Sequence, residues 1–320
     1  MTRDNAHSID SWTAYWRTGT GASCFEGPEV EVRLTRVWNE YVDALPNDTR
    51  ILDLATGNGT VARSCAARAR ARDIRLHIEA VDAAEIDPPK CVPDPEQLFR
   101  HVRFSGGIRL ETLPFPDGEF DGVVSQFGFE YADEEQAAAE AARVLAPGGR
   151  LRLIIHARDG AVSRDIGRRL ERLRSVLAEN GPVTLVLALA RAAEAGDAAT
   201  LGSKSGHLAA AAELVRRLEH NPPPDDSALF YSKEFLELWA QRSRYWPADL
   251  RRSVEQGWTN ANGVATRQEQ MLRAARSEDD IQRIGERFTA SGLTLDAVGQ
   301  IRDDRRGVQI AWMVDASRPA

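Results

Sequence analysis

The sequence has few cysteines and no long apolar segment. Its three cysteines, Cys24, Cys65 and Cys91, are widely spaced and form no Cys-x-x-Cys pair. Neither a disulfide framework nor a zinc site fits this number and spacing. The longest largely apolar run, residues 183–190, is far shorter than the ~20 residues of a membrane-spanning helix. The first residues lack the apolar core of a signal peptide, so we expect a cytoplasmic protein without a membrane partner.

Positive charge is also scarce. Lysine and arginine together number 41, against 48 aspartates and glutamates, which gives a net charge of −7. A nucleic-acid groove needs a basic surface, so this balance argues against a nucleic-acid partner. The six histidines form no cluster with metal-ligand spacing, and no metal site is predicted. Hydrophobic residues at 42% and charged residues at 28% are typical of a globular chain.

What the sequence does contain is an alternation of apolar strands and helical segments. Helices are expected at residues 60–72 and 134–145. The strands that flank them are expected at residues 51–54, 76–81, 102–104, 122–126 and 150–156. Strands separated by helices in this way form parallel βαβ units. The tail returns to strands at residues 293–301 and 308–316, which a polar turn joins as an antiparallel hairpin.

Residues 160–285 interrupt this pattern with helical spacing. Helices are expected there at residues 162–180, 183–196, 208–220 and 233–243. At 320 residues the chain exceeds a usual domain, which favours one α/β domain with a large insertion. The insertion holds three of the seven tryptophans, Trp239, Trp246 and Trp258. We expect a helical cap that defines the substrate, with most of these aromatic side chains packed in its own core.

A glycine-rich turn follows the first strand. Glycines at positions 57 and 59 let the chain turn tightly and let a ligand approach the main chain. Asp82, at the end of the second strand, is placed to accept ribose hydroxyls. A dinucleotide-binding fingerprint shares both features, so the turn alone leaves a nicotinamide dehydrogenase open.

Three further features separate the alternatives. Asp53 stands inside the first strand, ahead of the glycines. Residues 113–128 read Leu-Pro-Phe-Pro-Asp-Gly-Glu-Phe-Asp-Gly-Val-Val-Ser-Gln-Phe-Gly, and residues 143–151 read Arg-Val-Leu-Ala-Pro-Gly-Gly-Arg-Leu. In this order the set resembles the class I S-adenosylmethionine-dependent methyltransferases, and within them the small-molecule group that includes the ubiquinone and menaquinone C-methyltransferases. The resemblance covers residues 48–158 and 278–316.

This resemblance implies a fold and a division of the chain. The implied fold is a doubly wound, mostly parallel seven-stranded α/β sheet with a C-terminal antiparallel hairpin and a helical cap inserted between strands five and six. Residues 1–45 would form an N-terminal helical lid segment, and residues 46–158 with 278–320 the cofactor-binding core. Residues 159–277 would form the substrate-binding insertion. A homodimer is compatible with this organisation.

The resemblance also assigns cofactor contacts. Asp53 and the backbone of residues 55–59 would hold the methionine part, or Asp53 would only organise the turn. Asp82 would take the ribose hydroxyls. The cofactor-binding residues implied in this way are Tyr15, Trp16, Asp53, Ala55, Thr56, Gly57, Asn58, Gly59, Asp82, Ala83, Leu110, Glu111, Gln126 and Phe127.

Two of these assignments are less direct, because the sequence differs from the family at one position and a second set of residues has two possible roles. Arg109 stands where many relatives have an acidic residue facing the adenine amine, so the backbone of Leu110 and the carboxylate of Glu111 are substitutes. Glu111 is equally compatible with a solvated turn. N-terminal aromatic side chains such as Tyr15 and Trp16, with Trp12, would hold the cationic donor, or would simply pack a terminal helix onto the core.

Catalytic candidates follow from position on the sheet. His156 ends the fifth strand, at the edge where open α/β sheets bind ligands, and is the first candidate for a general base. Glu130 and Tyr131, just past the fourth strand, are the next candidates. A single histidine is commonly structural, and His207 in a Gly/Ser/Lys-rich loop is a weaker candidate.

The predicted function is transfer of a methyl group from S-adenosylmethionine to oxygen, nitrogen or carbon of a small organic acceptor, within specialised metabolism, with S-adenosylhomocysteine as product. In-line transfer needs alignment and water exclusion more than any particular side chain. Two alternatives therefore stay open. One is a cofactor-binding, methyltransferase-like protein that catalyses a non-methylating step, and the other is an NAD(P)-dependent dehydrogenase.

Overall fold

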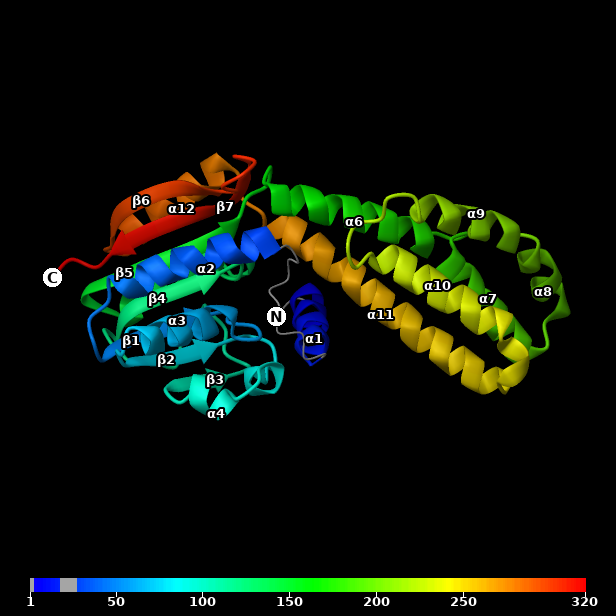
Figure 1. Cartoon of the computed structure of the whole chain (residues 1–320), viewed down its shortest axis with the longest axis horizontal. Helices are drawn as coiled ribbons and strands as arrows, with labels where there is room; N and C mark the ends of the chain where they lie inside the picture. Colours follow the sequence, from blue (N-terminus) through cyan, green and yellow to red (C-terminus); the bar gives the residue numbers. More distant parts are fainter. Residues whose placement is uncertain (1–2, 18–27) are drawn as a thin grey trace. The chain divides into compact units, whose positions relative to one another are not determined.

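The computed structural model describes residues 3–17 and 28–320, so Cys24 lies outside the described residues. The chain forms two compact units. The first, the sheet unit, comprises residues 1–164 and 273–320, and the second, the helical unit, comprises residues 165–272 (Figure 1). The described residues of the predicted lid segment (residues 1–45), 3–17 and 28–45, belong to the sheet unit. The roles assigned above to the lid, core and insertion remain predictions.

The sheet unit is built on one seven-stranded sheet, as predicted. Its strands are β1 (Thr49–Leu54), β2 (Leu76–Val81), β3 (Val102–Ser105), β4 (Phe120–Gln126), β5 (Leu145–His156), β6 (Thr294–Arg302) and β7 (Gln309–Ser317). Their order is β3-β2-β1-β4-β5-β7-β6. Pairing is parallel from β3 to β5, whereas β7 runs antiparallel to both β5 and β6. The predicted fold class is therefore confirmed.

The register of the parallel strands brings their carboxyl ends together. Leu54 at the end of β1 pairs with Val81 of β2 and with Ser125 of β4. Residues that directly follow these strands in the chain consequently meet at one edge of the sheet. Open α/β sheets bind their ligands at this edge.

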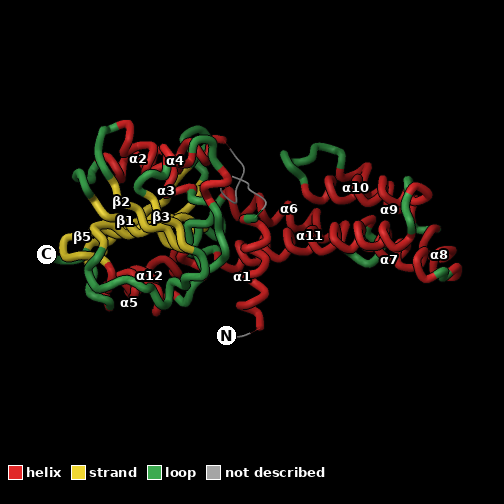
Figure 2. The backbone as a smooth tube through the Cα atoms, turned by 90° about the horizontal axis from the view of Figure 1, so that it is seen from below, coloured by secondary structure: helices red, strands yellow, loops and turns green. Residues whose placement is uncertain are grey.

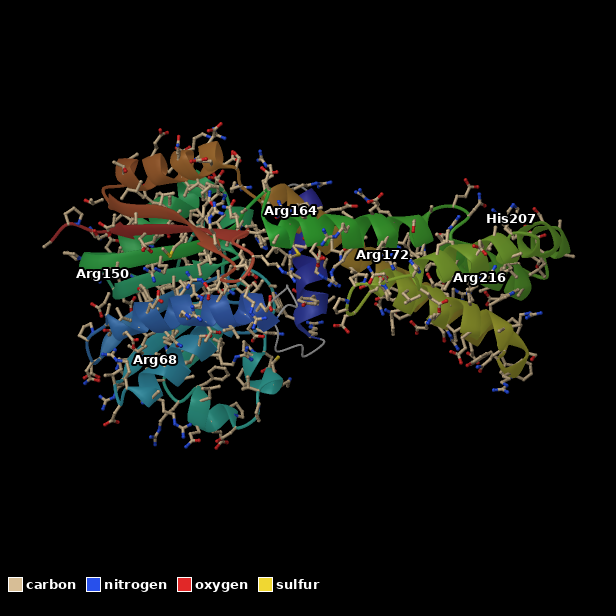
Figure 3. All side chains as sticks on the ribbon, turned by 45° about the horizontal axis from the view of Figure 1, so that its top comes forward. Arg68, Arg150, Arg164, Arg172, His207 and Arg216 are labelled. Carbon is tan, nitrogen blue, oxygen red and sulfur yellow. The ribbon has the colours of Figure 1, made fainter. Side chains whose placement is uncertain are left out.

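Helices cover both faces of the sheet (Figure 2). On one side lie α2 (Pro28–Asp43) and α3 (Thr60–Ala71), joined by the bidentate pair of Arg68 with Asp43 at 2.7 Å (Figure 3). On the other side lie α5 (Glu134–Val144) and α12 (Glu278–Ala290). The remaining elements of this unit are α1 (Arg3–Trp16), η1 (Pro88–Cys91), α4 (Pro95–Leu98) and η2 (Phe129–Tyr131).

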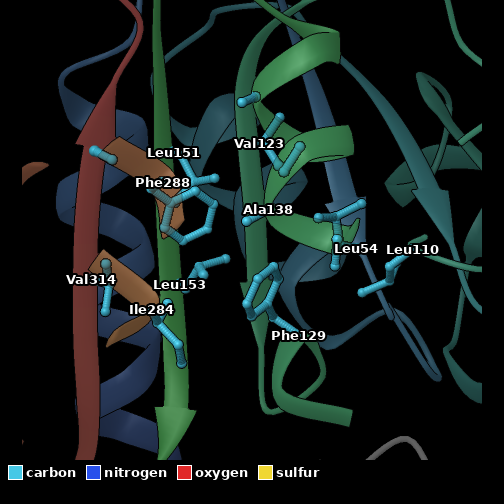
Figure 4. Packing of buried hydrophobic residues seen from close by; sticks show 14 of the residues in the cluster. Leu54, Leu110, Val123, Phe129, Ala138, Leu151, Leu153, Ile284, Phe288 and Val314 are labelled. Atoms are coloured by element: carbon cyan, nitrogen blue, oxygen red, sulfur yellow. The ribbon is translucent and has the colours of Figure 1, made fainter. Parts of the chain in front are cut away.

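Apolar side chains between the sheet and α5/α12 form the main core (Figure 4). Leu153 of β5 and Val314 of β7 face Ile284 and Phe288 of α12, and all four are fully buried. Burial of such side chains contributes about 1.5–3 kcal/mol each. This core fixes the strands whose ends carry the site.

The helical unit has a separate core. Its helices are α7 (Pro182–Ala195), α8 (Ala198–Ser205), α9 (Leu208–Leu218), α10 (Ser227–Ala240) and the short η3 (Arg242–Arg244), together with most of α6 (Ala161–Leu177) and α11 (Pro247–Ala274). Phe235 and Trp239 are buried in it and Tyr231 and Trp258 pack against it, whereas Phe230, Tyr245 and Trp246 are exposed, Trp246 to 80%. Helices α8 and α11 were not among the predicted ones.

A buried ion pair organises one end of the helical unit. Asp226 accepts from the backbone N–H of Ala228 at the start of α10, and it pairs with the Arg172 guanidinium of α6 (Figure 3). His207 lies in the same unit, exposed, with Nδ1 3.2 Å from the Ser203 carbonyl oxygen. A role of His207 as a general base stays a prediction.

One stretch passes a simple test for a membrane span. Residues 161–195 are long and apolar enough by length and composition, and 56% of the apolar window is buried within the protein. The stretch comprises two helices, because α6 ends at Leu177 and α7 begins at Pro182. A mostly buried core helix meets the same criteria, so the finding is weak support for a membrane contact.

Candidate cofactor and active site

A pocket lies at the carboxyl edge of β1, β2 and β4. Its volume is about 140 Å³. The residues that line the pocket come from α1, from the segments that follow these three strands, and from residues 109–111. They are Ile9, Trp12, Trp16, Ala55, Asp82, Ala83, Ala84, Arg109, Leu110, Glu111, Phe127, Gly128, Tyr131 and Ala132. The pocket thus collects residues from five separate segments of the chain.

The glycine turn adopts a conformation that requires glycine. Gly57 has φ +53°, and Gly59, which precedes α3, has φ +75°. A Cβ atom on Gly57 would stand 2.6 Å from Cζ2 of Trp16, closer than any real contact. The turn therefore forms a cradle whose main chain carries no Cβ at Gly57, and the Trp16 indole of α1 occupies the space beside it. A ligand that lies against main-chain N–H groups fits such a cradle.

Asp82 links the turn to the pocket. Its Oδ2 accepts from the N–H of Gly57 at 2.8 Å, and its Oδ1 accepts from the N–H of Ala84 at 2.8 Å. Burial raises the pKa of the Asp82 carboxyl to about 6, against the opposing effect of these two hydrogen bonds. Asp82 lines the pocket, and each carboxylate oxygen can accept a second hydrogen bond, so the carboxylate can also accept from ribose hydroxyls.

Asp53 is buried beneath the turn rather than exposed to the pocket. Its Oδ2 accepts from the Thr56 hydroxyl at 2.6 Å and from the N–H of Ala62 at 3.2 Å. Burial raises its pKa to about 7, and the charge of Asp82 acts in the same direction. These contacts support the role of organising the turn, and a role toward the methionine part stays a prediction.

Aromatic side chains of α1 cover the pocket. Trp12 stacks on Trp16 with ring centroids 5.6 Å apart, and it meets Tyr131 edge to face at 5.7 Å. Tyr15 packs against Trp16 at 4.8 Å and does not line the pocket. Trp12 and Trp16 thus line the pocket, and Trp12 also packs α1 against Tyr131; a role in holding the cationic donor stays a prediction.

Arg109 and Glu111 form an ion pair on the pocket wall. The guanidinium Nη2 lies 2.9 Å from Glu111 Oε1, which also accepts from the N–H of Asp133. The Glu111 side chain is only 11% exposed, so it is not a solvated turn residue. Arg109 thus places a positive charge on the pocket wall. In the family that the sequence resembles, an acidic residue is usual at this position.

His156 and Glu130 form a buried pair beside the pocket. The His156 Nδ1 lies 2.7 Å from Glu130 Oε1, which also accepts from the backbone N–H of His156. The side-chain atoms His156 Nε2 and Glu130 Oε2 are buried without a hydrogen-bond partner among the described residues. Phe127 stacks on the imidazole with ring centroids 4.1 Å apart and lines the pocket, whereas His156 does not.

The structure gathers many of the predicted site residues but not all. Of the predicted set, the pocket is lined by Trp16, Ala55, Asp82, Ala83, Leu110, Glu111, Phe127 and Tyr131. Thr56 and Asn58 are buried in the turn, and the carboxamide of Gln126 accepts from Trp38 Nε1 at 2.7 Å. The sequence reasoning did not find Ile9, Ala84, Gly128 and Ala132. Ala84, Gly128 and Ala132 each directly follow a predicted site residue in the sequence. Including the chain neighbours of the predicted residues would have found them.

Comparison with known proteins identifies the sheet unit. Residues 52–153 match the family model of a methyltransferase domain. The demethylmenaquinone methyltransferase of Thermus thermophilus is 44% identical over 106 residues, which cover 32% of this chain and 44% of that protein. The ubiquinone/menaquinone biosynthesis C-methyltransferase UbiE of Rickettsia massiliae is 34% identical over 126 residues, which cover 38% of this chain and 50% of that protein.

The chain spans about half, or less, of the length of these curated relatives. Among solved structures, the [4+2]-cyclase SpnF matches with a TM-score of 0.45 and 14% identity, over 90% of this chain and 80% of that chain. Geranyl diphosphate C-methyltransferase from Streptomyces coelicolor A3(2) matches with a TM-score of 0.42 and 12% identity, over 90% and 81%. At such TM-scores the likeness carries no weight for function.

The matched segment contains the glycine turn, Asp82 and the strand ends that form the pocket. The resemblance drawn from the sequence is therefore confirmed. The sheet unit carries a methyltransferase domain of the class I type, and S-adenosylmethionine is its cofactor.

Proposed function

We propose that this chain, whose residues 52–153 form a class I S-adenosylmethionine-dependent methyltransferase domain, transfers a methyl group to oxygen, nitrogen or carbon of a small organic acceptor. The observation that carries the proposal is the pocket, which brings together Ala55 of the glycine turn, the Asp82 carboxylate and aromatic walls at one sheet edge. A role in specialised metabolism, a cytoplasmic setting, a homodimeric assembly and the lack of nucleic-acid and membrane partners accompany it as predictions.

The residues present fit the cofactor. The main chain at Gly57 carries no Cβ, the Trp16 ring lies against it, and the buried Asp82 carboxylate accepts a hydrogen bond from its N–H. When bound, S-adenosylmethionine supplies an electrophilic methyl group on a positively charged sulfur. We assign to Asp82 the ribose hydroxyls, to Ala83 and Leu110 the adenine, and to Phe127 a place near the sulfur.

The aromatic walls have two functions in this proposal. The faces of Trp12 and Trp16 carry negative charge density, which attracts a cationic donor. The same rings, with Tyr131, keep water out of the pocket. Water exclusion and alignment are the main requirements for in-line methyl transfer.

Calorimetric titration with S-adenosylmethionine, S-adenosylhomocysteine, NAD and NADP tests the proposal. We expect micromolar binding of the first two and none of the nicotinamide cofactors. Binding of NAD or NADP instead would establish the dehydrogenase alternative. If S-adenosylmethionine binds but no methylated product forms with any acceptor while another product does, the non-methylating alternative holds.

A further inference from the structure

The cluster of Phe127, Glu130 and His156 has features that packing alone does not explain. His156 and Glu130 are 1% and 2% exposed, yet each keeps one side-chain polar atom without a hydrogen-bond partner within residues 3–17 and 28–320. Leaving such atoms unpaired in the interior is costly, and native structures rarely do so without a functional reason.

Phe127 adds an independent sign of strain. Its φ of +56° lies in the left-handed region, which a bulky side chain rarely adopts. Its N–H still donates to the Ile154 carbonyl at 2.8 Å, so the strand pairing continues up to this residue and then turns. The turn places the Phe127 ring between the pocket and the imidazole. Strained residues of this kind concentrate at functional sites.

Hydrogen bonding fixes the orientation of the imidazole. Glu130 Oε1 lies 2.7 Å from Nδ1, so a neutral imidazole donates its proton there and Nε2 carries the free lone pair. The Arg276 guanidinium donates to the backbone carbonyl of Glu130, and the His156 carbonyl accepts from the N–H of Arg276 at 2.8 Å. Glu130, Tyr131 and Arg276 are thus ionisable residues that contact His156, through its Nδ1, its ring and its carbonyl respectively.

We propose that His156 is a general base for an acceptor hydroxyl attached to an unsaturated carbon, as in a phenol or enol, that Glu130 is its positioning residue, and that Phe127 is a gate over it. This inference rests on the proposed function. The acceptor class follows from the chemistry of a base. A neutral amine already has its lone pair and a carboxylic acid is already ionised, whereas such a hydroxyl must lose a proton to attack efficiently.

The step balances with the groups named. The acceptor O–H bond breaks, and its proton moves to His156 Nε2. The oxygen electron pair forms a bond to the methyl carbon, while the methyl carbon–sulfur bond breaks and its electron pair stays on sulfur. The protonated imidazole is stabilised by the Glu130 carboxylate until the proton returns to solvent.

Chemical modification tests the gate without any acceptor. In wild type we expect diethyl pyrocarbonate to modify His156 slowly, because Phe127 covers it. Phe127→Ala should raise that rate at least about tenfold, and Phe127→Leu should give an intermediate rate. The exposed His207 is the internal control and should react equally in all three proteins. An unchanged rate at His156 in both variants would overturn the gate.

Methyl transfer tests the base and the acceptor class. The probes are 1-naphthol and 1-naphthylamine, which differ only in the attacking group. We expect transfer to 1-naphthol whose kcat falls about 10²–10⁴-fold in His156→Gln and His156→Asn, the range typical of a lost general base. Glu130→Gln should lower kcat less and displace the pH profile. Transfer to 1-naphthylamine should not depend on His156.

The same proteins separate this inference from the proposed function. S-adenosylmethionine titration should give the wild-type affinity for the His156 variants, and thermal unfolding checks that they are folded, at a lower stability because Glu130 loses its buried partner. A protein that does not bind S-adenosylmethionine refutes the proposed function. Two outcomes refute only the inference in a protein that binds S-adenosylmethionine. One is equal methylation of 1-naphthol with and without His156, and the other is no methylation of 1-naphthol at all.

Discussion

Gly57 is the residue whose conformation most directly limits the cofactor space. Gly57→Val places a branched side chain at φ +53° and within the Trp16 ring. We expect S-adenosylmethionine affinity to fall at least about 100-fold, which calorimetric titration measures. Stability should fall modestly, since the backbone strain costs on the order of 1 kcal/mol.

The chain offers a matched control for this substitution. Gly148 also has a positive φ, +77°, but a Cβ there meets nothing within 4 Å. Gly148→Val should therefore show the same strain with unchanged affinity. Equal affinity losses in both variants would mean that the turn does not hold the cofactor.

Asp53 links the site to pH-dependent stability. Its pKa of about 7 in the folded protein lies above the ~3.9 of an unfolded aspartate. Between these values the folded state binds more protons than the unfolded state, so this group lowers the free energy of unfolding as pH rises from about 4 to 7. Asp82, with a pKa of about 6, acts in the same direction.

Urea unfolding of wild type and Asp53→Asn between pH 4.5 and 8 measures this effect. The stability of wild type relative to the variant should fall as pH rises through this window. Asp280, whose pKa is lowered to about 2, stabilises the fold above pH 4 and contributes little change in this range. A relative stability that rises with pH would contradict the burial of an ionisable Asp53.

Helix α1 carries two tryptophans whose fluorescence can report cofactor binding. Trp12 and Trp16 line the pocket, so binding of S-adenosylmethionine should change the tryptophan emission. The double variant Trp12→Phe/Trp16→Phe should lose most of that change. Trp246→Phe, which removes the 80% exposed indole of the helical unit, should retain it. A change that survives the double variant would place the reporter outside α1.

The whole molecule contains two separate hydrophobic cores. Phe288 is fully buried in the core of the sheet unit and Phe235 in that of the helical unit. We expect two calorimetric transitions. Phe288→Ala should lower one and Phe235→Ala the other, each by about 3–5 kcal/mol of unfolding free energy.

Cofactor binding identifies which transition is which. S-adenosylmethionine should raise only the transition that Phe288→Ala lowers, because a ligand stabilises the unit that binds it. A single transition that both substitutions lower and the cofactor raises would show that the two units unfold as one.

Local periodicity accounts for what could be predicted of the fold. The strands and helices from residue 49 to residue 156 have the spacing of half-buried or buried elements, and the predicted boundaries differ from the observed ones by a few residues. The exceptions are instructive. Strand β5 begins at Leu145 and includes the Pro147-Gly148-Gly149 turn signal, because Phe120 of β4 pairs with Leu145. The 28 residues of α11 contain polar and glycine positions that weaken its helical pattern.

The sequence by itself determined the sheet, the turn and the identity of most pocket residues, because these depend on spacing along the chain and on where parallel strands end. Tertiary structure decided which atoms meet. The pairing of His156 with Glu130, the Phe127 ring stacked over it and the contact of Gln126 with Trp38 join residues of different elements. No pattern in a single segment encodes such contacts, since they arise only when β4, β5 and α2 are packed together.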